Sequence, residues 1–127
     1  MIKLKLDYDF VRQLLLHIEE KAPLQGLDNK DLYKFAADKN KNKEDLEYTI
    51  IKLKEGKLIT ANLRYASNKL QRIYNVNLTY QGHEYLNNIR DNKIWKNTKK
   101  VSSKLSSVSL EILKSIAINE INKVIGL

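Results

Sequence analysis

The fold of this chain is decided by residues 58–78, LITANLRYASNKLQRIYNVNL. Apolar residues occupy every second position in residues 59–65, and a similar alternation returns in residues 73–78 after a polar connection at residues 66–69. In the second run, the face expected to be apolar holds Tyr74, Val76 and Leu78. Two alternating runs with a short polar connection predict a β-hairpin. A two-stranded hairpin is marginally stable alone, so it must pack against the rest of the chain.

Three helices are predicted before the hairpin. The first spans residues 8–21, where apolar residues recur at helical spacing, with Asp7 or Asp9 as its cap and Pro23 beyond its end. A second, short helix follows Asp28, a candidate N-cap. The third spans about residues 43–56; Asn42 and Asp45 have capping-box spacing, and Gly56 suits its C-terminal end. The order helix, helix, helix, hairpin predicts an α+β winged helix-turn-helix domain over residues 1–79.

Residues 80–127 are predicted to form a helical C-terminal extension. Thr79 is the expected N-cap of a helix in which Gly82 allows close packing, and a break is expected near Asp91 and Asn92. A linker rich in Lys and Ser follows. A last helix, at about residues 108–125, has an apolar side made of Leu110, Leu113, Ala117, Ile121 and Val124. A helix this apolar is expected to be buried against its own domain or in a homodimer.

Composition narrows the class of protein. The net charge is +8, from 23 basic and 15 acidic side chains, and it favours a polyanionic partner. The chain has no cysteine, which excludes disulfides and thiolate metal sites. It has no apolar run long enough to span a membrane and no signal-peptide pattern at its N-terminus. We therefore expect a cytoplasmic protein with no membrane contact.

Double-stranded DNA is the first partner that this pattern indicates. In the winged-helix arrangement, the third helix enters the major groove and the hairpin tip contacts the backbone or the minor groove. Lysines 39 and 41, in the turn before the third helix, could reach phosphates. The expected DNA-binding residues are Lys41, Lys43, Tyr48, Thr49 and Lys52 around the third helix, with Arg64, Lys69 and Arg72 on the wing.

A protein partner is the alternative. The third helix begins with Glu44 and Asp45, followed by Glu47, and carboxylates at this end would repel phosphates. Acidic residues also favour a helix N-terminus electrostatically and need no partner for that. If these acids interrupt the basic surface, a phage-linked module that binds a host protein becomes the better hypothesis. A structural adaptor that uses the apolar terminal helix is a third one.

Several stretches carry a family resemblance: residues 9–19, residues 53–61, and above all residues 78–91 with Trp95 and Lys96. The last contains Gly-His-Glu at 82–84 and Ile-Arg-Asp at 89–91. On these motifs, the chain resembles the YjcQ-type winged-helix proteins and a similar uncharacterised family of bacterial prophages and mobile elements. The resemblance implies the fold and a phage-linked origin, hence a transcriptional regulator. The chain departs from that family at Thr49, often His there, and at Lys57, often Gly.

Two interpretations remain open for the residues of this signature. They could form a contact patch for a partner, or Arg90 and Asp91 could pair locally while Trp95 packs with its indole N–H satisfied. The signature residues are His83, Glu84, Arg90, Asp91 and Trp95.

Enzyme chemistry and bound metals are not expected. The two histidines, His17 and His83, belong to different helices, whereas a metal site needs three or four ligands. No serine lies in a Gly-x-Ser-x-Gly setting, and the four glycines form no phosphate-binding loop. We predict no catalytic residues, no metal and no cofactor.

Overall fold

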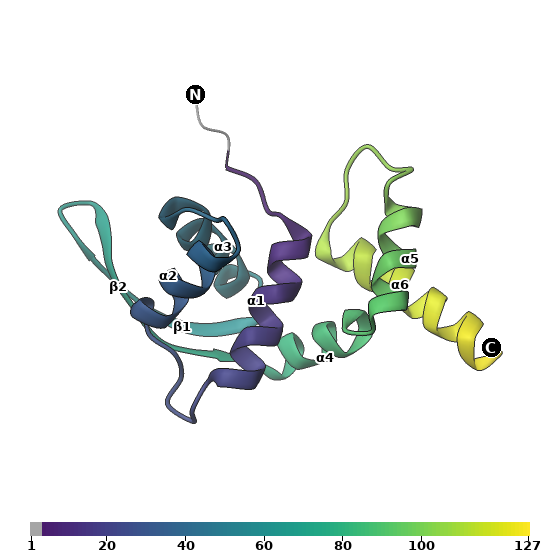
Figure 1. The fold of residues 1–127 in the computed structure, drawn as a ribbon, viewed down its shortest axis with the longest axis horizontal. Coiled ribbons are helices and arrows are strands. Elements are labelled where there is room, and N and C mark those ends of the chain that lie inside the picture. The colour runs from purple at the N-terminus through teal and green to yellow at the C-terminus, as the bar shows by residue number, and fades with distance from the viewer. Residues whose placement is uncertain (1–3) are drawn as a thin grey trace. The chain divides into compact units, whose positions relative to one another are not determined.

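The computed structural model describes residues 4–127 as a mixed α+β chain, with six helices and one two-stranded antiparallel hairpin in that range (Figure 1). The chain divides into two compact units, Met1–His83 and Glu84–Leu127. The elements are α1 (Tyr8–Lys21), α2 (Asn29–Asp38), α3 (Lys43–Glu55), β1 (Ile59–Ala66), β2 (Lys69–Leu78), α4 (Tyr80–Ile89), α5 (Asn92–Ser102) and α6 (Leu110–Ile125). Their order is compatible with a winged helix. Over residues 4–127, no helix is long and apolar enough to cross a membrane.

The first three helices begin where the capping residues predicted. Asp7 Oδ1 accepts hydrogen bonds from the amides of Asp9 (3.0 Å) and Phe10 (3.2 Å). Asp28 and Asn42 cap α2 and α3 by accepting from the third residue on, at 3.3 and 2.8 Å. These caps satisfy amides that have no partner within the helix. The core of the first unit comes mainly from Phe10, Val11, Leu14, Leu15, Ile18, Leu32, Leu46, Ile50, Leu53, Ile59, Ile73 and Val76.

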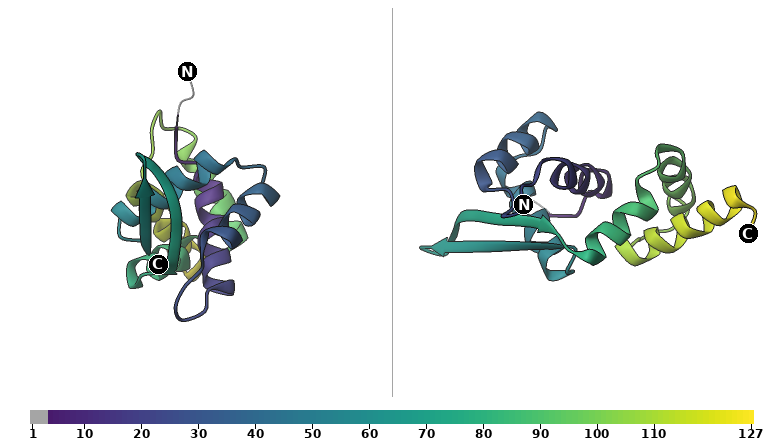
Figure 2. Two further views of the ribbon diagram at one scale, coloured as in Figure 1. Left: turned by 90° about the vertical axis from the view of Figure 1, so that its left-hand side faces the viewer. Right: turned by 90° about the horizontal axis from the view of Figure 1, so that it is seen from below.

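The hairpin is present, and its turn is short. Ala66 pairs with Lys69, so only Ser67 and Asn68 connect the strands. Both have left-handed backbones, with φ of 52° and 63°. Two positive φ angles are what a two-residue type I′ turn requires, and this turn matches the twist of the strands. In both Figure 1 and the right panel of Figure 2, the turn projects beyond the helices of its unit.

The expected alternation of the second strand is wrong. Thr60 pairs with Asn77 but Asn62 pairs with Tyr74, so β2 has one residue more than β1 between these pairs. Asn75, in the bulge, has a φ of 57°. Ile73 and Val76, three positions apart, are therefore both buried, whereas Tyr74 and Leu78 are only half-buried. A bulge moves the inward face by one residue, which a strict period of two does not describe.

A short segment after α1 extends the sheet. Leu27 and Val76 exchange two backbone hydrogen bonds, both of 3.0 Å. Gly26 precedes this bridge with a φ of +93°, and a Cβ at Gly26 would lie 2.5 Å from the carbonyl carbon of Asn75. Only glycine fits both the backbone conformation and the close approach. The bulge in β2 and the glycine before Leu27 are thus packed against each other.

The start of α4 is fastened to the connection between α3 and β1. Thr79 Oγ1 accepts from the amide of Gly82 (2.9 Å), as an N-cap does, and donates to the carbonyl of Lys57 (2.6 Å). The Thr79 amide donates to the carbonyl of Leu58 (3.0 Å). A Cβ at Gly82 would lie 2.0 Å from that same carbonyl oxygen. The close packing that was predicted for Gly82 is confirmed.

In the second unit, the helix break and the terminal helix are both present. α4 ends at Ile89, and Asp91 caps α5 by accepting from the amide of Ile94 (2.9 Å). α6 packs against α5 through Leu113 and Ala117, which are both buried. The expected apolar side of α6 is buried only in part. Leu110 and Ile121 are half-buried, and the Val124 side chain is 67% exposed.

Candidate nucleic-acid interface

The wing surface consists of Arg64, Lys69 and Arg72, the basic residues between Ile59 and Leu78. All three are exposed, on the far half of the hairpin. The guanidinium of Arg72 lies 4.4 Å from the centre of the Tyr74 ring. Stacking of a guanidinium on an aromatic ring restricts its orientation and leaves its donors available to an anion.

The hairpin has no acidic partner for these cations in its own sequence. Between Glu55 and Glu84 the chain contains no Asp or Glu. A soluble surface normally mixes both signs of charge. A stretch of this length with only one sign produces a positive potential, and the projecting turn extends it away from the helices.

Arg64 and Arg72 are directly opposite each other in the ladder. Like charges at opposed positions of an antiparallel pair destabilise it. The fold gains nothing from this pairing, whereas a ligand with closely spaced negative charges would be held by both guanidinium groups. Backbone phosphates are ligands of this kind.

The exposed side of α3 has a different chemistry. Residues i, i+4, i+7 and i+11 of an α-helix share one stripe. The stripe opposite the buried residues consists of Glu44, Tyr48, Ile51 and Glu55, and we call it the α3 stripe. It is acidic and partly apolar. The expected basic residues of the helix, Lys43 and Lys52, lie on its two flanks, since nine residues rotate the helix by about half a turn.

Contacts within the protein engage these flanking lysines. Lys52 is 3.3 Å from Glu55 and lies over the ring of Tyr48, at 5.5 Å from its centre. On the other flank, Lys43 lies 5.4 Å from the ring centre of Tyr33. The Tyr33 hydroxyl donates to Glu47 at 2.6 Å. Burial, followed by this hydrogen bond and the charge of Glu47, raises the pKa of Tyr33 well above its ordinary value.

One expected contact residue, Thr49, is placed elsewhere than predicted. Thr49 was expected near the exposed side of α3, but only 3% of it is exposed. Its hydroxyl donates to the carbonyl of Asp45 (2.7 Å), which allows a polar residue to face the core. The spacing Leu46, Thr49, Ile50, Leu53 is itself the pattern of a buried helix face and could have predicted this.

Lys41, which was expected to reach phosphates, has partners within the fold. Its ammonium is 2.7 Å from Asp7 and 5.6 Å from the ring centre of Phe10. Burial alone would raise the pKa of Asp7. The hydrogen bonds from Lys41 and from the amides of Phe10 and Asp9, with the charge of Lys41, outweigh burial and lower it. This pair joins the turn before α3 to the start of α1.

The residues of the 82–95 signature have separate environments. His83 lies 3.5 Å from Glu19 in the first unit, and Glu84 begins the second unit. Arg90 donates twice to the side chain of Asn87, at 3.1 and 2.8 Å, and Asp91 caps α5. Trp95 is buried, with 4% exposed, which is the packed position that one of the two interpretations expected.

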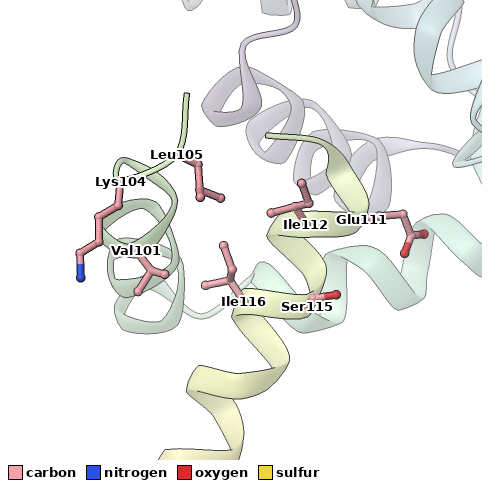
Figure 3. A pocket seen from close by; sticks show the side chains of 7 residues that line it. All are labelled: Val101, Lys104, Leu105, Glu111, Ile112, Ser115 and Ile116. Carbon is pink, nitrogen blue, oxygen red and sulfur yellow. The ribbon is translucent and has the colours of Figure 1, made fainter. Parts of the chain in front are cut away.

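The second unit has a hollow of about 400 Å³ between α5 and α6. In Figure 3, the side chains of Val101, Leu105, Ile112 and Ile116 point toward one another across it, while Lys104 and Glu111 point away. Apolar side chains are exposed further along as well: Val124, Ile125 and Leu127 at 67, 62 and 86%. Among the described residues, no three His, Asp or Glu side chains are grouped so as to hold a metal ion.

Comparison with known proteins shows the family of this chain, and the family's description names no activity. A family model described as "Hypothetical protein (DUF2513)" matches residues 5–109. An "Uncharacterized protein" of Haemophilus influenzae is 30% identical over 116 residues, which cover 90% of this chain and 92% of the relative. No solved structure matches this chain.

Proposed function

The chain belongs to the DUF2513 family, and we propose that it is a winged-helix protein that binds double-stranded DNA through its hairpin wing. In this proposal, residues 1–79 form the winged-helix domain, related in fold to the YjcQ-type proteins. The wing surface contacts the phosphate backbone. The protein acts in the cytoplasm as a transcriptional regulator of a phage or mobile element, and it uses no catalysis and no cofactor.

The observation that carries the proposal is the wing surface. Its opposed arginines cost the hairpin stability, and no carboxylate of the hairpin offsets their charge. A neighbouring pair of phosphates would remove this repulsion. Binding of this kind releases counterions, depends strongly on salt and carries little sequence information by itself.

Dimerisation through α6 is part of the same proposal. Winged-helix and other helix-turn-helix dimers bind two half-sites, so a dimer is more specific than one domain bound to one half-site. The support is the apolar surface left exposed at the end of α6, at Val124, Ile125 and Leu127. Light scattering on the whole chain and on a chain ending near Ser106 would measure the number of chains in each particle. The same number for both proteins would contradict a dimer formed through α6.

The experiment for the wing is fluorescence anisotropy with a random-sequence duplex at low salt. We expect Arg64→Gln/Arg72→Gln to weaken binding by roughly 10- to 100-fold, because two phosphate contacts are lost. Both side chains are exposed, so the fold should be unaffected. The matched control is Lys21→Gln/Lys93→Gln, which removes two exposed charges that are not part of the hairpin. Equal weakening by the two variants would mean that net charge, and not the wing, drives binding.

The α3 stripe supports a second candidate function, the binding of a host protein. Glu44 and Glu55 lie where a recognition helix would face the bases, and with Tyr48 and Ile51 they form a surface of mixed acidic and apolar character. Protein interfaces are enriched in tyrosine and apolar residues at their centre, while charged residues such as glutamate belong to the polar rim. DNA contact by the wing and protein contact by α3 would then use separate surfaces.

Removing the carboxylates of Glu44 and Glu55 distinguishes DNA contact by α3 from protein contact by α3. If α3 enters the major groove, Glu44→Gln/Glu55→Gln should raise the affinity for duplex DNA several-fold, because repulsion of the phosphates is relieved. The control Glu20→Gln/Glu111→Gln changes net charge equally at other exposed sites. An affinity no higher than the control's would place α3 away from the DNA and leave its stripe to a protein partner.

A further inference from the structure

A basic hollow that the wing surface does not line lies in the first unit. It has a volume of about 840 Å³ and is formed by the end of α3, the base of the hairpin and the start of α4. Neither Arg64, Lys69 nor Arg72 lines it. Six of its lining residues have side chains that could recognise an anion or a base: Lys54, Lys57, Asn62, Asn75, Tyr80 and Gln81.

The charge of this hollow is positive. Lys54 and Lys57 line it, and no carboxylate does. The acid between them in sequence, Glu55, is turned toward Lys52, at 3.3 Å. A concave surface with cations of one sign concentrates the field and attracts anions more than a flat surface does.

Two residues of the hollow have a left-handed backbone, which lysine disfavours and asparagine tolerates. Lys57 has a φ of 63° and Asn75 a φ of 57°. Lys57 follows the C-cap Gly56, at the position where glycine is the preferred residue. Lysine in the last turn of a helix complements the helix dipole, which accounts for Lys54. It does not account for a lysine held in a disfavoured conformation just beyond the helix, and such strain is concentrated at functional sites.

The remaining lining residues have the chemistry that recognises a nucleobase. Asn62, Asn75 and Gln81 each carry an amide with both donors and an acceptor, and all three are exposed. Tyr80 is an aromatic residue with 78% of its surface exposed. Bases stack on aromatic side chains and hydrogen-bond through their edges, while lysines hold the attached phosphate.

We infer that this hollow binds one nucleotide unit, with its phosphate at Lys54 and Lys57 and its base against Tyr80. The unit could come from a free nucleotide or from a single nucleic-acid strand, since both offer the same phosphate and base. This inference does not depend on duplex binding by the wing, because the two surfaces share no residue.

The test uses the whole chain and a fluorescein-labelled eight-nucleotide oligo(dT), followed by anisotropy. We expect Lys54→Gln/Lys57→Gly to weaken binding at least tenfold, and Tyr80→Ser to weaken it by about 5- to 100-fold. Lys57→Gly suits the left-handed backbone, so its melting temperature should be unchanged or higher, which separates lost binding from lost folding. The matched control is Lys21→Gln/Lys93→Gln, which makes the same change of charge at exposed sites outside the hollow and the wing surface, and we expect it to have a smaller effect.

Competition by thymidine 5′-monophosphate then identifies the source. Displacement of the oligonucleotide at millimolar concentration supports the hollow as a site for a free nucleotide, and binding of the oligonucleotide without displacement supports a strand. No binding of either probe, or equal loss in the hollow variant and the control variant, would overturn the inference. A protein that fails to bind duplex through its wing but binds oligo(dT) through Lys54, Lys57 and Tyr80 would disprove the proposed function alone.

Discussion

Replacing Gly82 by alanine is expected to lower the free energy of unfolding by about 2–4 kcal/mol, the cost of severe overpacking. The added Cβ would lie 2.0 Å from the carbonyl oxygen of Leu58, which is a backbone atom. That oxygen cannot simply move aside, because it accepts the hydrogen bond from the amide of Thr79. Relief would require α4 to separate from the connection between α3 and β1.

Thermal denaturation followed by circular dichroism measures this effect, and we expect the melting temperature to fall by roughly 10–20 °C. Gly56→Ala is the matched control. Its new Cβ would meet its nearest atom, the carbonyl oxygen of Lys52, at 3.4 Å, and the φ of Gly56 is −78°. It should therefore leave stability unchanged or slightly higher. Equal melting temperatures for Gly82→Ala and the wild type would contradict the close packing of α4.

The second large effect is expected from Arg64→Glu, which should weaken duplex binding while it strengthens the hairpin. The new carboxylate would be opposite Arg72, so a repulsive pair becomes an attractive one. Opposed charges of unlike sign contribute about 0.2–1 kcal/mol to an antiparallel pair. The same change removes one phosphate contact and adds a repulsive charge, which should reduce affinity at low salt by roughly 10- to 100-fold.

This opposite change of stability and affinity is hard to obtain by accident, since most substitutions that impair binding through misfolding also lower stability. Denaturation midpoints and anisotropy titrations on the same preparation measure both quantities. Undiminished affinity would exclude Arg64 from the interface. A lower stability would mean that Arg64 and Arg72 do not repel each other across the strands.

The sequence was sufficient for the elements whose signals are local. Caps at Asp7, Asp28 and Asn42 lie within three residues of the amides they bind, and the hairpin turn is contained in Ser67 and Asn68. Gly82 could be predicted as a close contact because glycine in a helix costs stability without such a reason.

Features that depend on distant segments were not predictable in the same way. The bulge at Asn75 is fixed partly by Leu27, which bridges to Val76 across a separation of 49 residues in the chain. Ile73 and Val76 were nevertheless a signal, because two apolar residues three apart do not fit a regular strand with one buried face.

The candidate sites show the same limit. Arg64, Lys69 and Arg72 could be placed on the wing from the turn alone, but their register could not, so the opposed arginines emerged only with the strand pairing. The polar residues around Lys41 in the sequence predict an ordinary exposed lysine. Its ion pair with Asp7 joins segments 34 residues apart, which no local pattern reveals. The nucleotide hollow combines three elements, and no local motif marks it.

The measurement that tests the central claim most directly is the salt dependence of duplex binding by the wild type and by Arg64→Gln/Arg72→Gln. The logarithm of the binding constant falls linearly with the logarithm of the salt concentration, by about 0.9 for each phosphate neutralised. If the wing binds the backbone through both arginines, the variant's slope should be smaller by about 1.8. The same slope for both proteins, or no binding by the wild type at low salt, would contradict a wing that binds DNA.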